Sequence, residues 1–242
     1  MNHQPVDDLV DRAIASAIDW AATNGEPPRH FFILALYTKT PAQTELIELI
    51  QAFVSSGPSE QTTLRTIIEQ KLDCFIRKGP GDHPCPEWAV ATMRGLWMFA
   101  TNDFEESVSC DRDALEIVQG TNSWMEAVSN FNISEHYLRV EGEYAEALRY
   151  VTNAIVIDPR NQGFWSNYAI ASLLEGSEKH RAMGLKVLRD LPAFANDGTL
   201  DTVWVTLLEL EPEYADMLST ELELVPRLKN WLDKTRGSNT PL

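Results

Sequence analysis

The chain has 242 residues, 44% of them hydrophobic, and carries a formal net charge of −16. The hydrophobic fraction is ordinary for a folded protein with a sizeable core. The charge argues against binding nucleic acid or anionic lipid, because both need clustered Lys and Arg to meet phosphate groups. The charge is also uneven: residues 81–160 carry 14 acidic and 5 basic side chains, a net −9.

Nothing in the sequence indicates secretion or a membrane span. The N-terminal residues lack the positive and apolar regions of a signal peptide. The longest apolar run, residues 31–37, is far shorter than the roughly 18 residues that a membrane helix needs. Cys74, Cys85 and Cys110 are an odd, widely spaced set, which suits reduced thiols in a cytosol. We therefore expect a cytoplasmic protein.

Apolar residues recur at helical spacing along the whole chain, with no convincing alternating strand. A helix is predicted over residues 6–22, and the segment 29–37 is predicted as helix although it is also compatible with a strand. Thr40-Pro41 opens a further helix that Ser56-Gly57-Pro58 closes, and another follows over 59–78. Three Pro and two Gly within 79–86 then indicate a break.

Beyond this break, helices are predicted in pairs separated by short turns. Residues 88–100 lead to a turn at 102–107, residues 122–140 to a turn at 142–144, and residues 164–174 to a turn at 176–177. Gly142 and Gly176 are 34 residues apart, and so are Phe131 and Trp165. Two independent pairs of residues with the same separation indicate a repeated structural unit.

This pattern resembles the tetratricopeptide repeat, a helix–turn–helix unit of about 34 residues. The resemblance covers roughly residues 87–192, with departures: Asn102 and Gly142 lie 40 residues apart, and Glu135 stands where a small residue normally lets the helices approach. It implies an all-α fold, a right-handed superhelical stack of antiparallel helix pairs. Around the repeats we expect an N-terminal helical region that could hold divergent repeats (1–79), C-terminal capping helices (193–234) and a flexible tail (235–242).

The resemblance also implies a binding groove, because the first helix of each repeat lines the concave side in this family. Mapped onto this chain, the groove residues are Asn132, His136, Arg139, Ser166, Asn167 and Ile170. Amide and guanidinium groups at this spacing could hold an extended peptide or a carboxylate. The alternative is that they only solvate an unused face, and that His136 is a structural residue rather than a pH switch.

Acidic side chains crowd one short segment. The predicted acidic patch consists of Asp103, Glu105, Glu106, Asp111, Asp113 and Glu116. Such a dense run is typical of a solvated helix face, or of a surface that steers a basic partner, rather than of paired catalytic acids in a pocket.

No catalytic motif or metal-binding spacing is present, and the grouping of His83 with Cys85 and Cys74 matches no zinc pattern. We expect no catalytic residue, no cofactor and no metal. The leading hypothesis is a non-enzymatic adaptor or scaffold that binds a peptide or helix of another protein in the groove. The alternative is an acidic chaperone or immunity-type protein that sequesters a basic effector. An enzyme would require a deep pocket of clustered ionisable groups lined by the acidic segment.

Overall fold

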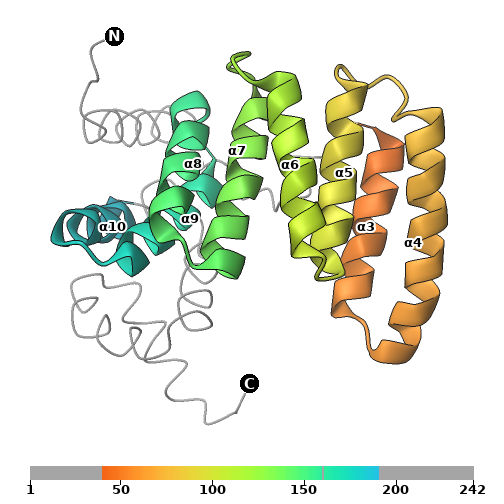
Figure 1. The fold of residues 1–242 in the computed structure, drawn as a ribbon, viewed down its shortest axis with the longest axis horizontal. Coiled ribbons are helices and arrows are strands. Elements are labelled where there is room, and N and C mark those ends of the chain that lie inside the picture. Colours follow the sequence, from red (N-terminus) through yellow and green to blue (C-terminus); the bar gives the residue numbers. More distant parts are fainter. Residues whose placement is uncertain (1–39, 160, 191–242) are drawn as a thin grey trace. The chain divides into compact units, whose positions relative to one another are not determined.

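A computed structural model describes residues 40–159 and 161–190 of the chain, and every regular element in these residues is a helix (Figure 1). The elements are α3 (Pro41–Ser55), α4 (Pro58–Lys78), α5 (Pro86–Ala100), α6 (Phe104–Val118), α7 (Trp124–His136), the π-helix η1 (Tyr137–Glu141), α8 (Tyr144–Ile157), α9 (Gln162–Glu175) and α10 (Glu178–Asp190). For this part of the chain the all-α prediction is confirmed. The predicted helix at 6–22, the segment 29–37, the caps at 193–234 and the tail at 235–242 lie outside the described residues.

The chain divides into two compact units. One is Phe31–His136, and the other combines Met1–His30 with Tyr137–Leu242. The division falls inside the region 87–192, which the sequence predicts as one repeat array, so the predicted domain boundaries stay predictions. Across both units, none of the helices that the structure describes is long and apolar enough to cross a bilayer.

In the first unit, proline and capping residues set the helix ends that the sequence predicts. Pro41 occupies the first position of α3, and the Thr40 hydroxyl accepts a hydrogen bond from the backbone N–H of Gln43 at 3.3 Å. Pro58 likewise begins α4, which ends before Gly79. Proline suits this position because its missing N–H would have no partner within the helix. The predicted bounds of these two helices are therefore confirmed to within one residue.

The core of this unit lies between helices that follow one another along the chain. α3 packs against α4 and α5, and α6 packs against α5 and α7, so the five helices lie side by side in Figure 1. Trp88 and Trp97 are 0% and 3% exposed and pack in this core. The indole N–H of Trp88 donates to the Ser129 hydroxyl at 2.8 Å and so ties α5 to α7.

A close approach of α5 to α6 depends on Gly95. A Cβ added to Gly95 would lie 3.1 Å from Oδ1 of Asp111 and 3.4 Å from the Cβ of Cys110. The Ser107 hydroxyl on α6 also donates to the Gly95 carbonyl oxygen at 2.9 Å. Small residues at this crossing bring the two helix backbones together.

Three of the predicted turns contain a residue in the left-handed conformation. The φ angles are 63° at Asn102, 68° at Gly142 and 80° at Gly176. Such a residue ends a helix and reverses the chain, and only glycine and, less readily, asparagine adopt the conformation routinely. The three predicted turns are confirmed in position, but residues 104–107 of the first form the start of α6 and Tyr144 begins α8.

In the second unit, α9 packs against both α8 and α10. Trp165 and Ile155 are both 0% exposed. A Cβ on Gly184 of α10 would lie 3.0 Å from Cγ of Leu173, so the crossing of α9 and α10 is also close.

The sequence predicts one helix over 122–140, whereas in the structure α7 ends at His136 and the chain continues as the π-helix η1.

Candidate binding site

A half-open pocket lies among α5, α6 and α7, with a volume of about 70 Å³. It is lined by Gly95, Leu96 and Phe99 of α5, Ser107 and Asp111 of α6, and Phe131, Asn132 and Glu135 of α7. One water molecule needs roughly 10–15 Å³, so the pocket has room for several water-sized groups. All of its lining residues belong to the first compact unit.

The Asp111 carboxylate is the most unusual group in this pocket. Its residue is only 6% exposed, although aspartate is rarely buried in folded proteins. The side-chain amide of Asn132 donates to Oδ1 of Asp111 at 3.0 Å. The absent side chain at Gly95 leaves room for the same oxygen. The pocket is therefore built so that α5 makes space for a carboxylate that α7 holds in place.

Burial raises the pKa of Asp111 from 3.8 to about 7, while the hydrogen bond from Asn132 opposes this shift. Loss of hydration disfavours the charged form of a carboxyl group, whereas a donated hydrogen bond favours it. The net result is a carboxyl group that exchanges its proton near neutral pH. A perturbed acid inside a pocket is a recognised mark of a functional site.

The other polar groups of the pocket are engaged in contacts. Ser107 donates to the Gly95 carbonyl oxygen, and Arg94 beside the pocket pairs with Glu106 at 2.9 Å. Glu135 lines the pocket from α7 and is half-buried. Apart from these, the walls are the apolar side chains of Leu96, Phe99 and Phe131. The site therefore combines one buried acid with apolar walls.

This arrangement is poorly suited to nucleophilic catalysis. The nearby Cys110 thiol has its pKa raised to about 11, chiefly by burial, with Arg94 opposing the shift and Glu106 adding to it. A thiol of that pKa stays protonated at neutral pH and is a weak nucleophile. The ionisable side chains that line the pocket are Asp111, from the acidic segment, and Glu135.

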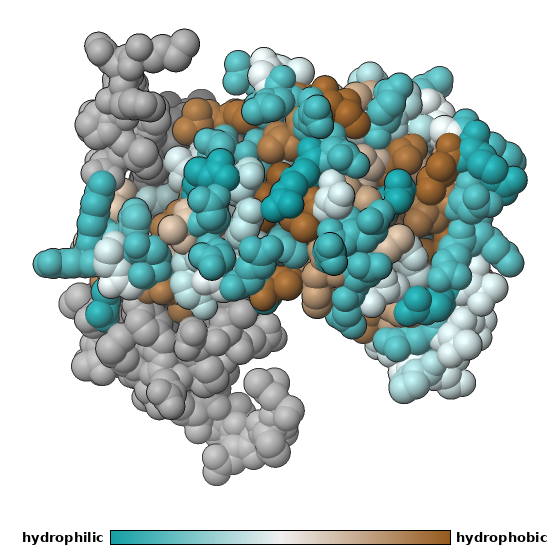
Figure 2. All heavy atoms as spheres, viewed as in Figure 1, coloured by the Kyte–Doolittle hydropathy of each residue, from teal (hydrophilic) through white to brown (hydrophobic). Residues whose placement is uncertain are grey.

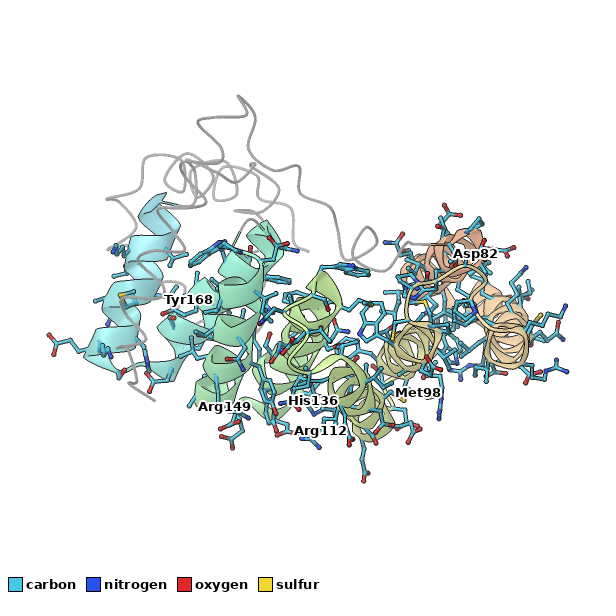
Figure 3. The ribbon with its side chains drawn as sticks, turned by 90° about the horizontal axis from the view of Figure 1, so that it is seen from above. Asp82, Met98, Arg112, His136, Arg149 and Tyr168 are labelled. Carbon is cyan, nitrogen blue, oxygen red and sulfur yellow. The ribbon has the colours of Figure 1, made fainter. Side chains whose placement is uncertain are left out.

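The residues of the predicted acidic patch differ in exposure. Asp103, Glu105, Asp113 and Glu116 are exposed and Glu106 is half-buried, whereas Asp111 turns into the pocket. Asp103 also caps α6, because its Oδ1 accepts from the backbone N–H of Glu106 at 3.4 Å. Arg112, labelled in Figure 3, is an exposed base on the same helix. Figure 2 shows hydrophilic side chains (teal) interspersed with hydrophobic ones (brown) on the face in view.

The predicted groove residues are mostly inaccessible. Ser166, Asn167 and Ile170 on α9 are 3%, 4% and 1% exposed, and His136 is 4% exposed. Asn132 and Arg139 are half-buried, and Asn132 binds Asp111. Asn132 lines the pocket among α5, α6 and α7.

Sequence reasoning identified Asp111 and Asn132 separately but did not bring them together, and it did not assign Phe99 or Phe131 to a pocket. One signal was available. Four buried positions of α6 recur at helical spacing, and a carboxylate occupies one of them: Ser107, Asp111, Ala114 and Val118. A charged residue within the buried stripe of a helix indicates a paired or functional acid.

His83 and Cys85, which the sequence groups with Cys74, contact each other, and His83 also contacts Trp88. The His83 ring lies over Trp88, with centroids 5.7 Å apart, and its Nδ1 accepts from the backbone N–H of Cys85 at 3.0 Å. Among the residues that the structure describes, no group of three or more His, Cys, Asp or Glu side chains is placed to hold a metal ion.

Comparison with known proteins identifies no relative: no protein-family model, no curated protein and no solved structure matches this chain.

Proposed function

We propose that the chain is a tetratricopeptide-like array of helical hairpins that acts as a non-enzymatic interaction module, an adaptor or scaffold that binds a peptide or helix of another protein. Short left-handed turns and packing between consecutive helices support this proposal. In such an array each hairpin buries its apolar face on its neighbours, and the exposed side of the stack is left for a partner.

The observation that carries the proposal is the position of the pocket. Two of the three helices that line it, α5 and α7, are those that the repeat resemblance makes the first helices of successive units. First helices form the binding side in that architecture. The pocket is half-open, and its apolar walls with one buried acid suit recognition of a side chain. A cytoplasmic location is part of the same proposal.

A second candidate, supported by the net charge of −16, is an acidic chaperone or immunity-type protein that sequesters a basic effector. The two candidates differ in their response to salt. Interactions between exposed charges weaken as ionic strength rises, because the screening length falls from about 10 Å at 0.1 M to about 3 Å at 1 M. Apolar contacts in a pocket do not weaken in this way.

The test begins with the immobilised full chain, an extract of the native host, and washes at low and at high salt. Each retained protein is then purified and its affinity measured by calorimetry at both ionic strengths. A partner that keeps its affinity in high salt supports the interaction module. A partner whose affinity collapses in high salt supports sequestration instead, and a chain that binds no purified candidate contradicts both.

A further inference from the structure

The pocket among α5, α6 and α7 combines a buried carboxyl group with apolar walls. Asp111 supplies the carboxylate, and Leu96, Phe99 and Phe131 supply apolar wall. A ligand that matches both features has a positive charge at the tip of an aliphatic stem. The volume of about 70 Å³ accommodates a charged head with a few methylene groups but excludes a large ring system.

The geometry of the hydrogen bond from Asn132 selects among cations. Because Oδ1 of Asp111 already accepts a hydrogen bond from Asn132 and lies close to Gly95, a planar guanidinium group would have to share that oxygen with the amide. Arginine gains most from two parallel hydrogen bonds to a carboxylate, whereas an ammonium group acts as a compact point charge. A lysine-like head therefore suits this site better than an arginine-like one.

The walls reinforce this selection. Lysine buries its aliphatic stem along apolar surface while its charged head meets a polar group. Two of the wall residues, Phe99 and Phe131, are aromatic, and the face of an aromatic ring attracts cations. The second acid of the pocket, Glu135, adds negative charge on the α7 side.

The charge of the surrounding chain matches a basic partner. Residues 81–160, which include all three helices of the pocket, carry a net −9. Exposed acids on α6, such as Asp113 and Glu116, add to the negative charge that attracts a basic protein to this unit from a distance. The charge of this part of the chain thus favours a lysine-bearing protein over an acidic or neutral one.

We propose that this pocket binds a primary ammonium group on an aliphatic stem, the side chain of a lysine presented by a basic partner protein. The inference rests on the proposed interaction function and specifies the anchor that the partner supplies. The lysine Nζ donates to the Asp111 carboxylate, and its methylene groups lie against the apolar walls. The exposed acids of α6 contribute to the rate of encounter rather than to the anchor itself.

The first experiment uses n-butylammonium chloride as the probe, with n-butanol and n-butylguanidinium as comparisons. Each is titrated at pH 8 and constant ionic strength into the ¹⁵N-labelled full chain while the Asn132 side-chain amide and the Gly95 backbone amide are followed by NMR. We expect saturable shifts with n-butylammonium, and affinity at least ~10-fold weaker for n-butanol, which cannot form the charge-assisted hydrogen bond. Equal or tighter binding of n-butanol or n-butylguanidinium would overturn the inference.

Two variants assign the effect to the buried acid. Asp111→Asn keeps the shape of the side chain but removes its charge, and it should weaken n-butylammonium binding ~10-fold or more. Asp113→Asn removes the same charge from an exposed position of the same helix and should leave affinity within about twofold, as expected of an exposed charge. Unchanged affinity in Asp111→Asn, or equal losses in both variants, contradicts a lysine anchor at Asp111. Circular dichroism of each variant verifies that the helices are retained.

The same variants separate this inference from the proposed function. A purified partner that binds the wild-type chain and binds Asp111→Asn equally well overturns the lysine anchor and leaves the interaction module standing. A partner that loses affinity for Asp111→Asn but not for Asp113→Asn supports both. If n-butylammonium binds but no protein partner does, the proposed interaction function is wrong. The proposal that the natural ligand is a lysine of a partner protein is then wrong as well.

Discussion

The side-chain amide of Asn132 on α7 donates a 3.0 Å hydrogen bond to the Asp111 carboxylate on α6. This contact links two helices through a charged group that is almost entirely removed from water. An ionised group in such surroundings opposes folding unless its hydrogen bonds compensate for lost hydration. Asp111 is therefore the residue at which stability and the proposed binding are most directly coupled.

Asp111 should make the chain less stable as pH rises. Its folded-state pKa, about 7, lies above the unfolded value of 3.8, so the folded chain binds more protons between these values. The free energy of unfolding then falls as pH rises through this window and levels off above the folded pKa. We expect Asp111→Asn to gain about 2–3 kcal/mol over the wild type on going from pH 5 to pH 8.

Urea unfolding at several pH values measures this difference directly. Subtracting the variant from the wild type removes the contributions of all groups that the two chains share. Asp113→Asn is the control, since it removes the same charge from an exposed position of α6. A constant difference for Asp111→Asn would show that Asp111 titrates normally.

Gly95→Ala should destabilise the first compact unit. The new Cβ would lie 3.1 Å from Oδ1 of Asp111, which is closer than ordinary packing allows. Overpacking of this kind costs about 1–3 kcal/mol, which outweighs the gain of about 1 kcal/mol from replacing glycine within a helix. Thermal and urea unfolding provide the measurement.

A double-mutant cycle makes the Gly95 prediction specific. In an Asp111→Ala background the carboxylate is gone, so Gly95→Ala should become neutral or stabilising through helix propensity alone. If Gly95→Ala is equally damaging in both backgrounds, its effect comes from a contact other than Asp111.

Ser129→Ala should lower stability by about 1–3 kcal/mol, because it removes the acceptor of the buried Trp88 indole N–H. Ser109→Ala on α6 is a suitable control, since Ser109 is exposed and should change stability by less than about 0.5 kcal/mol. Urea unfolding monitored by tryptophan fluorescence compares the two. Equal effects would mean that the hydrogen bond contributes nothing measurable.

The turn at Asn102 offers a test of backbone strain. Its φ of 63° is unfavourable for residues with a Cβ by about 1–2 kcal/mol, a penalty that asparagine partly escapes and glycine avoids. Asn102→Ala should therefore destabilise the α5–α6 hairpin by about 1 kcal/mol, whereas Asn102→Gly should not. The melting temperatures of both variants and of the wild type test this prediction. A glycine variant that is less stable than the wild type would contradict backbone strain at Asn102.

Local features of the fold could be predicted from the sequence, whereas the pocket could not. Pro41, Pro58 and the turns at Asn102, Gly142 and Gly176 act within a few residues, so their effects are readable from neighbouring positions. The π-helix after His136 has no such local signal, and the sequence predicts an uninterrupted helix there. The elements predicted within residues 1–39 and 191–242 stay predictions, because the structure does not describe these residues.

The pocket depends on contacts between residues far apart in sequence. Asp111 belongs to a run of acidic residues, a pattern that predicts a solvent-exposed helix face. Its burial results from the packing of α5 and α7 on α6. The six predicted groove residues were assigned from position within a repeat, but position does not determine exposure. Asn167 shows the difference, since it holds an expected groove position and is 4% exposed.

Packing between helices adjacent in sequence also has a kinetic consequence. The α5–α6 and α8–α9 hairpins close over short turns, and α6 meets α7 across a few residues. Contacts of short sequence separation require little loop-closure entropy before they form, and chains dominated by them reach the native state rapidly. Each hairpin of this chain can therefore assemble while later residues are still being synthesised, and its apolar surface is exposed for only a short time before the next helix covers it.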